Sequence, residues 1–384
     1  MKTVVLIFIL LSMPASNVAI AQNNLLLHWS VAGQLPSNGD QPHAGLAGAV
    51  IGWNKDVLLV AGGANFPDKF PWEGGKKKYH STIYLFQKSG KKFAPVSAEQ
   101  QLSFPIAYAA HCTTSKGIIV IGGENENGFL ADAFSLQMNL PGTAVIIEKL
   151  PAIPIATSNA AAVSIADNVY LIGGETSVGT TAACWKLDLS QPQLGWKSIS
   201  SLPFPLSFSS AVVVGKANST SIAVLGGRSK VAGQISDFSS RVFLYSPDTD
   251  RWNQAPSLPY PISAGTALSW ERENILLLGG DRGTTFSQVE QKIIEIAKAP
   301  ENDREELIRQ KNQLLSDHPG FSKDVLIYNP KNGKTRVLGQ IPFPVPVTTT
   351  AIWMDSSLVI PSGEVRAGVR TPNILLAEIK PVQR

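Results

Sequence analysis

The stretch Val57-Leu58-Leu59-Val60-Ala61-Gly62-Gly63 sets the pattern of this chain, because an apolar run that ends in two glycines recurs along it. Later copies share that apolar run and end at a second glycine: Gly123, Gly174, Gly227, Gly280 and Gly363. The sixth copy, Leu358-Val359-Ile360-Pro361-Ser362-Gly363, keeps only the second glycine. The second glycines lie 60, 51, 53, 53 and 83 residues apart. This spacing indicates one structural unit used six times.

A second marker, an apolar residue followed by proline, runs in phase with the glycines. Its clearest copies are Leu150-Pro151, Leu202-Pro203, Leu258-Pro259 and Ile341-Pro342. Between markers each unit fits four short strands, most clearly over residues 209–215, 222–227, 241–246 and 252–255. Short, regularly spaced strands with a Gly-Gly signature are typical of kelch propeller blades. The sequence therefore predicts an all-β, six-bladed kelch β-propeller over residues 22–384.

The two ends of the chain predict how this ring closes. The last unit offers strands at 348–354, 358–363 and 373–380 but no fourth strand. Residues 25–31, near the N-terminus, have the composition of a strand and lie before the first unit, so they belong to no unit by sequence order. We expect this segment to pair with residues 373–380 and complete the last blade, because closure removes an exposed sheet edge.

Two stretches interrupt the repeat. Residues 64–80 carry prolines, glycines and three consecutive lysines, and residues 284–320 account for the 83-residue spacing. In the second stretch, apolar residues at intervals of three, four and seven predict two short amphipathic helices, over 287–298 and 303–316. Asn302 or Asp303 supplies the start signal of the second helix. Propellers place such insertions on one face, where ligands bind.

Composition excludes several classes of protein. The chain has 384 residues, of which 44% are hydrophobic and 16% charged. That is enough apolar material for a large core, which excludes a wholly disordered chain. The net charge of +4 is small for this length, and no basic run alternates with aromatic residues. We therefore expect no nucleic-acid partner.

The first 21 residues are typical of a cleaved signal peptide. Lys2 is their only charge, residues 4–13 form a short apolar run, and Ala19-Ile20-Ala21 offers a small-x-small cleavage site. The run is too short to span a bilayer, and no later segment approaches the ~20 apolar residues that a membrane helix needs. The sequence predicts a periplasmic protein that begins near Gln22 and does not insert into the membrane.

Common catalytic and metal-binding motifs are absent. There is no Gly-x-Ser-x-Gly elbow, His-Glu-x-x-His, phosphate-binding glycine loop or Cys-x-x-Cys, which disfavours nucleotide hydrolysis, zinc proteolysis and thiol redox chemistry. The five histidines fall in separate units without the spacing of metal ligands. Cys112 and Cys184 are expected to be unpaired buried thiols, with a disulfide as the alternative.

The residues that follow the glycine pairs should face the mouth of the central channel. These are Ala64, Glu124, Glu175, Arg228, Asp281 and Glu364. Each alone suits a turn or a cap. Together, carboxylates and a guanidinium around one rim suit a small polar, anionic ligand.

The segment 362–372 is the most distinctive part of this rim. It carries Glu364 together with Arg366 and Arg370. Arginine can hold a carboxylate through two parallel hydrogen bonds. A neighbouring glutamate can move protons on the same ligand.

With these residues the chain resembles the kelch-type N-acetylneuraminate epimerase, or sialic-acid mutarotase, family of bacterial envelopes. The matching pieces are Gly363, Glu364, Gly368, Arg370 and Thr371, the insertion before them, the loop 61–64 leading to Glu73, Gly74, Lys77 and Tyr79, the segment 105–111 with Tyr108, and Gly122-Gly123-Glu124. In the family's usual order the Glu/Arg segment precedes the Gly-Gly-Ala loop. Here the loop comes first, so the chain resembles a cyclically permuted branch.

The resemblance implies an isomerase that opens and recloses the ring of an acid sugar, sialic acid. It implies that Glu364 is the general acid/base and that Arg370 anchors the sugar carboxylate. Arg366, Lys77, Tyr79, Tyr108 and Glu124 would form the rest of the pocket. It implies neither a metal nor an organic cofactor.

Two other functions remain open from the sequence. The protein could be a kelch module that binds a glycan or a protein without catalysis, or a mutarotase of another sugar. A protein-binding face would carry exposed Trp, Tyr and Arg anchors. Trp29, Trp196 and Trp252 fall in blade-closing strands, which leaves Trp72 as the one tryptophan expected to be available. Whether the chain forms a homodimer is also open.

Overall fold

A computed structural model describes residues 25–37, 39–54, 56–96, 100–139, 143–216 and 219–381. The predicted signal peptide, residues 1–21, lies outside the described residues. The rest forms a six-bladed β-propeller with two α-helices, α1 (Thr284–Lys298) and α2 (Glu301–Ser316). In the described part of the chain, neither helix is long and apolar enough to cross a membrane.

Each blade is an antiparallel sheet of four main strands, and the first strands of neighbouring blades lie side by side around the channel. The first three blades are β2 (Val50–Asn54), β3 (Val57–Ala61), β6 (Thr82–Ser89) and β7 (Lys92–Pro95), with β8 (Gln100–Gln101) beside β6; β9 (Ala110–Thr114), β10 (Gly117–Ile121), β13 (Ala133–Met138) and β14 (Val145–Leu150); and β15 (Ala161–Ile165), β16 (Asn168–Ile172), β19 (Cys184–Asp188) and β20 (Lys197–Ile199). The last three are β21 (Ser210–Lys216), β22 (Ser219–Leu225), β25 (Val242–Ser246) and β26 (Arg251–Ala255); β27 (Thr266–Trp270), β28 (Asn274–Leu278), β29 (Asp324–Tyr328) and β30 (Thr335–Gln340); and β31 (Ile352–Met354), β32 (Ser357–Arg366), β33 (Val369–Pro381) and β1 (Leu25–Gln34).

Burial along the strands follows their place in the blade. The second strand β3 reads VLLVA and is buried throughout, because other blades cover both of its faces. The outermost strand β14 alternates between half-buried and exposed residues over its first four positions, 145–148. A continuous apolar run therefore marks a second strand, while alternation marks an edge.

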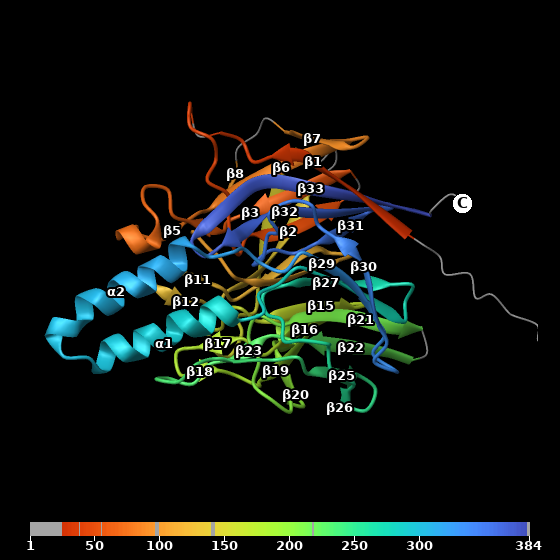
Figure 1. Ribbon diagram of the computed structural model, residues 1–384. Helices are drawn as coiled ribbons and strands as arrows, with labels where there is room; N and C mark the ends of the chain where they lie inside the picture. The colour runs from red at the N-terminus through yellow and green to blue at the C-terminus, as the bar shows by residue number, and fades with distance from the viewer. Residues whose placement is uncertain are drawn as a thin grey trace, which may run out of the picture.

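The predicted closure of the ring is confirmed. β1 pairs with β33 in antiparallel register, from Leu25 opposite Pro381 to Gln34 opposite Asn373. Figure 1 shows the red β1 lying beside the blue β33. The last blade thus combines both ends of the described chain, and β33 is left without an open edge.

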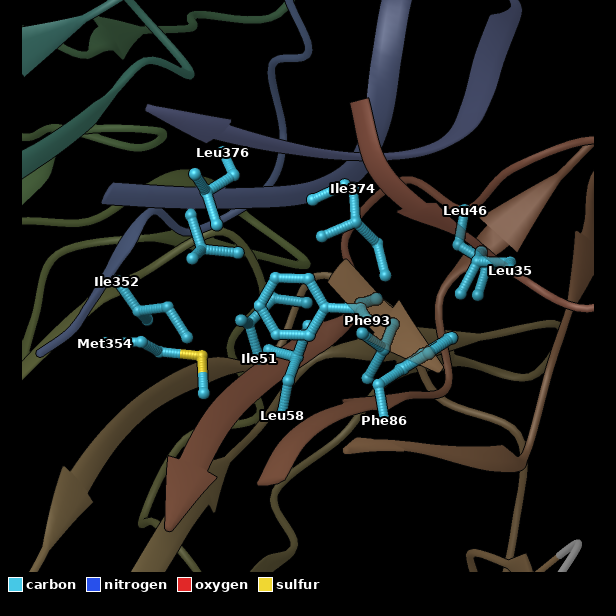
Figure 2. Packing of buried hydrophobic residues seen from close by; sticks show 14 residues of the cluster. Leu35, Leu46, Ile51, Leu58, Phe86, Phe93, Ile352, Met354, Ile374 and Leu376 are labelled. Carbon is cyan, nitrogen blue, oxygen red and sulfur yellow. The ribbon is translucent and has the colours of Figure 1, made fainter. Parts of the chain in front are cut away.

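Six apolar clusters fill the spaces between neighbouring blades. Figure 2 shows the cluster at the closure, where Ile51 and Phe86 of the first blade meet Ile352, Met354 and Leu376 of the last. Burying one side chain of this size contributes roughly 1.5–3 kcal/mol. The ring is therefore closed by packing as well as by strand pairing.

The glycine pairs allow close approach between blades. Gly122 has φ +61°, and a Cβ there would lie 2.2 Å from the carbonyl oxygen of Thr157, on the segment entering the next blade. The amide of Gly123 donates to that same oxygen at 2.8 Å. In the sixth copy Ser362 takes the left-handed conformation with φ +52°, and its hydroxyl accepts from the amide of Leu46 at 2.8 Å.

A closed ring of backbone hydrogen bonds surrounds the channel, and we call it the backbone belt. Its six members have φ between +51° and +65° and occupy the same place before each blade: Gly48, Tyr108, Asn159, Phe208, Ala264 and Thr348. The amide of each donates to the carbonyl oxygen of the member before it, at 2.7–3.1 Å, and Gly48 donates to Thr348 to complete the circle. All six blades therefore share one interior hydrogen-bonded ring.

Both helices begin earlier than predicted. α1 starts at Thr284 after a left-handed Gly283, and α2 starts at Glu301 after Pro300, so the predicted start signal of the second helix, Asn302 or Asp303, is not its cap. Figure 1 shows the helices at the end of the ring that carries four short hairpin strands: β11 (Glu124–Asn125), β12 (Gly128–Phe129), β17 (Glu175–Thr176) and β18 (Gly179–Thr180). Cys112 and Cys184 are both free thiols, and burial raises the pKa of each to about 12.

Candidate functional site

A cavity of about 370 Å³ lies where the residues that follow the glycine pairs meet the two helices. Five of the six predicted rim residues line it: Glu124, Glu175, Arg228, Asp281 and Glu364. The belt members Tyr108, Asn159, Phe208, Ala264 and Thr348 also contribute to its lining. Residues of the helical insertion, 284–320, complete the lining, so this insertion caps this end of the channel.

The backbone fixes where each rim residue points. Glu364 exchanges two hydrogen bonds with Val347, the residue just before the belt member Thr348, at 2.8 and 3.0 Å. The same bridge joins the equivalent residues of the other five units. Rim side chains are thus held at a constant position relative to the belt, which is why the residue after each glycine pair reaches the cavity.

Glu364 and Arg370 face each other across the hairpin of β32 and β33. Glu364 accepts a hydrogen bond on Oε1 from the amide of Gly368 at 2.7 Å, and its Oε2 lies 3.7 Å from Nη2 of Arg370. The Arg370 side chain is only 4% exposed and lies over the ring of Phe66 at 4.7 Å. Its positive charge is therefore directed at Glu364 and shielded from water, whereas Glu364 faces the cavity.

Oε1 of Glu124 is held by two donors, and the Ser158 hydroxyl donates to its Oε2 at 3.4 Å. The Tyr79 hydroxyl donates to Oε1 of Glu124 at 2.7 Å, and Lys77 Nζ donates to the same oxygen at 3.2 Å. Burial and the bond to Glu124 raise the pKa of Tyr79 to about 12, so this hydroxyl keeps its proton. Burial by itself lowers the pKa of Lys77, but Tyr108, Glu124 and Tyr79 together raise it above its ordinary value. Lys77 therefore stays charged.

Asp281 and His318 form a further titratable pair in the lining. Burial raises the pKa of Asp281, although its Oδ1 accepts from the amide of Gly283 at 2.8 Å. Burial lowers the pKa of His318, although Asp281 and Glu364 act in the opposite direction. His318 accepts on Nδ1 from the amide of Gly320 at 3.0 Å, so a neutral ring carries its proton on Nε2.

The roof of the cavity is apolar. Val289 of α1 and Leu315 of α2 line it together with three aromatic rings: Phe238, Phe286 and Phe321. Glu290, on α1, fastens this roof to the ring, because it accepts from the Ser236 amide at 2.7 Å and from the Ser236 hydroxyl at 3.0 Å. A ligand in the cavity would meet charged groups around the rim and hydrocarbon above.

The structure places only some of the predicted site residues at the cavity. Four of them line the cavity: Lys77, Tyr108, Glu124 and Glu364. Tyr79 and Arg370 lie behind the lining residues. Each contacts a carboxylate that lines the cavity, Tyr79 that of Glu124 and Arg370 that of Glu364. Arg366 instead donates through Nη1 to the carbonyl oxygen of Ser316, the last residue of α2, at 3.3 Å. The catalytic and binding roles of these residues stay predictions.

Sequence reasoning missed two contributors to the site. His318 was treated as one of five scattered histidines, and only the folded insertion brings it beside Asp281 and Glu364. Phe208 was overlooked although it occupies the same repeat position as Tyr108, so an alignment of the six units would have found it. Among the residues that the structure describes, no three His, Cys, Asp or Glu side chains are grouped as a metal site.

Fold and site together define a six-bladed β-propeller with a small-molecule cavity rich in proton-transfer groups. A family model described as N-acetylneuraminate epimerase matches residues 150–383, which is more than half of the chain. The chain belongs to the N-acetylneuraminate epimerase family. The matched range includes Glu364, Arg370 and the whole insertion, and it leaves out Lys77, Tyr79 and Glu124.

Curated relatives carry the same name. The chain is 26% identical over 236 residues to the N-acetylneuraminate epimerase of Vibrio vulnificus (strain YJ016), covering 58% of each chain. It is 25% identical over 253 residues to that of Yersinia pestis (strain Pestoides F), covering 63% of this chain and 60% of the relative. The Salmonella typhi protein is 25% identical over 239 residues, covering 59% and 58%. The chain thus spans less than two thirds of the length of these relatives.

Proposed function

We propose that this protein interconverts the α and β anomers of N-acetylneuraminate by acid–base opening and closure of the sugar ring. The observation that carries the proposal is Glu364, which faces a cavity of about 370 Å³ while the guanidinium of Arg370 lies 3.7 Å behind it. The volume is within the range of small-molecule sites. The family to which the chain belongs supports the sugar.

The proposed reaction needs two proton transfers. Glu364 takes the proton of the anomeric hydroxyl, the bond between the anomeric carbon and the ring oxygen breaks, and Glu364 returns the proton to the ring oxygen. Reclosure on the opposite face of the carbonyl reverses these transfers and gives the other anomer. The Gly368 amide holds Oε1 of Glu364, which fixes the carboxylate for the transfer. Spontaneous mutarotation is already appreciable, so one positioned acid–base group supplies a sufficient acceleration.

The tryptophans argue against a face built for protein binding. Trp196 and Trp252 donate through Nε1 to the carbonyl oxygens of Pro151 and Ser200, at 2.8 and 2.7 Å, and so tie neighbouring blades together. Trp72, which the sequence left available, is half-buried and stacked on Phe70 with ring centroids 4.7 Å apart. None of these three rings is presented as an interface anchor.

The test follows freshly released α-N-acetylneuraminate by NMR with and without the protein. Glu364→Gln keeps the shape of the side chain and removes the proton acceptor. It should lower the enzymatic exchange rate by roughly 10²–10⁴-fold while binding, measured by calorimetry, survives. Glu126→Gln, an exposed acid in the turn after Glu124, is the matched control and should leave the rate unchanged. Full exchange in Glu364→Gln would remove Glu364 from the mechanism.

We also propose that the enzyme acts in the periplasm after removal of residues 1–21. The small-x-small sequence at Ala19-Ile20-Ala21 supports this location. Mass spectrometry of the native protein should then find an N-terminus at Gln22. A cytoplasmic protein that retains Met1 would contradict it.

A further inference from the structure

Arg228, in β23 (Arg228–Ser229), is the most unusual cation in the cavity. Its guanidinium lies between the rings of Phe208 and Phe286, 4.3 Å from each ring centroid. All three side chains line the cavity. The two rings shield the guanidinium carbon from water and restrict the orientation of the group, which leaves its N–H edge to donate hydrogen bonds.

That edge has no hydrogen-bond acceptor among the residues that the structure describes. Glu175 Oε1 lies 3.6 Å from Nη2 of Arg228, which is too long for a hydrogen bond. Glu175 is instead held by the hydroxyl of Ser207 at 3.0 Å and the side-chain amide of Asn159 at 3.2 Å. The Nε of Arg228 is buried without a partner. Buried donors without acceptors are rare, and at a ligand cavity they indicate where a ligand supplies the acceptor.

Lys77 and Arg370, the other two predicted cations near the cavity, are less available to a ligand. Lys77 donates to Glu124 at 3.2 Å. Arg370, the predicted carboxylate anchor, also has two buried nitrogens without a partner in the described structure, Nε and Nη1. Its side chain is only 4% exposed and does not line the cavity, whereas that of Arg228 is 14% exposed and does. A carboxylate in the cavity would therefore reach the edge of Arg228 more readily than that of Arg370.

We propose that Arg228 binds the carboxylate of the acid sugar, through a paired hydrogen-bond arrangement along the edge left open between the two rings. This inference rests on the proposed function and names the residue that makes the cavity selective for an acid. Arg370 then acts as a positioning residue for Glu364. The proposal also gives the insertion a role in binding, because Phe286 belongs to α1 and forms one side of the stack.

The test compares the binding of N-acetylneuraminate with that of its methyl ester, which lacks the charged carboxylate, by calorimetry. Arg228→Lys keeps the charge and loses the planar fork, so it should weaken the acid about ten- to hundredfold and leave the ester unchanged. Anomer exchange at saturating acid should persist. Arg241→Lys is the matched control and should change neither affinity. Arg241 also stacks on a ring, that of Phe204 at 4.1 Å, but it does not line the cavity.

Phe286→Leu is a second variant that leaves Arg228 in place. It should weaken the acid more than the ester, because the guanidinium loses one of the rings that hold its plane. Arg370→Lys should lower the exchange rate and keep the preference for acid over ester. Melting temperatures of all variants report on folding.

The outcomes separate this proposal from the proposed function. Equal weakening of acid and ester by Arg228→Lys, or no weakening of either, overturns the assignment of Arg228 and leaves the epimerase function standing. If the wild-type protein binds another sugar acid in place of N-acetylneuraminate, and Arg228→Lys abolishes that preference, the assignment holds and the substrate is wrong. If the wild-type protein binds no sugar acid, both fall.

Discussion

Gly122 shows at the scale of one residue why the glycine pairs mark the fold. In its left-handed backbone conformation, any residue with a side chain is less stable than glycine. The Thr157 carbonyl oxygen also occupies the place that a Cβ would take. The first effect is conformational and the second is steric, and two substitutions can separate them.

Gly122→Ala should therefore destabilise the protein more than Gly90→Ala. Gly90 has a similar φ of +57°, but no atom lies within 4 Å of the place that its Cβ would take. The control should cost about 1–2 kcal/mol from the left-handed conformation alone. Gly122→Ala should add the displacement of Thr157 and its hydrogen bond to Gly123. Denaturant unfolding measures both, and equal losses would refute the close-approach account.

His43 gives a residue-scale prediction for pH. Burial, with a smaller effect of His80, lowers its pKa from 6.5 to about 4. Its Nδ1 accepts from the Gly45 amide at 2.9 Å, which requires an unprotonated nitrogen. Between these pH values the unfolded chain binds more protons than the folded one, so stability rises with pH. The contribution, on the order of 3 kcal/mol, should be complete above pH 6.5 and lost as the pH falls toward 4.

The variant His43→Gln should flatten that profile, whatever its stability at neutral pH. His28→Gln, at an exposed position of β1, should leave the profile as in the wild type. Unfolding free energies between pH 4 and 7.5 provide the measurement. An unchanged slope in His43→Gln would show that other groups set the acid sensitivity.

Apart from those that the family resemblance supplied, single site residues were predictable only where the repeat places them. Glu124 and Glu364 follow glycine pairs, so their position at the cavity could be read from the sequence. His318 could not, because its approach to Asp281 depends on how the insertion folds back. Arg228 was assigned to the rim, but its stack requires Phe286, which comes from a different element.

At the scale of elements, the insertion depends on one buried carboxylate. Glu290 is 7% exposed, accepts two hydrogen bonds from Ser236, and lies 3.7 Å from Lys230 Nζ. These bonds fasten α1 to the loop between β23 and β24 (Asp237–Phe238). The sequence predicted the helices from their periodicity, but it did not show what holds them to the ring.

Glu290→Ala should release α1 from the ring. It leaves the buried Ser236 amide without an acceptor, which should cost about 1–3 kcal/mol locally. Hydrogen exchange of the α1 amides should become faster, and binding of the sugar should weaken because Phe286 is no longer held. Glu295→Ala is the control, because Glu295 is a half-buried acid of the same helix whose hydrogen bonds, from Gln291 and Lys292, stay within α1. Equal exchange in both variants would mean that Glu290 does not hold the helix.

At the scale of the whole molecule, the closure of the ring followed from counting strands. The last unit lacked a fourth strand and the N-terminal segment lacked a blade, so their pairing was the one arrangement that used both. The cluster of Figure 2 adds a part that counting could not supply, since it requires the first and last blades to match in shape.

Deleting residues 22–33 should open the last blade. β33 would expose the edge that it now presents to β1, and the apolar side chains beneath would lose their cover. Aggregation or a large loss of melting temperature is expected, measured by light scattering and calorimetry. Deletion of residues 1–21 alone is the control. A soluble shortened protein with an unchanged melting temperature would contradict closure by β1.

The backbone belt also separates what the cavity recognises from what holds the molecule together. Its hydrogen bonds use main-chain atoms only, yet Tyr108, Asn159, Phe208, Ala264 and Thr348 all line the cavity. One conformation accepts five different side chains, and only Gly48 is restricted, because a Cβ there would lie 2.5 Å from the ring of Tyr108. Mutation can therefore exchange these five residues and redirect the protein toward a new sugar while the scaffold is preserved. The floor of the site is the natural place to diversify in a library designed to change specificity.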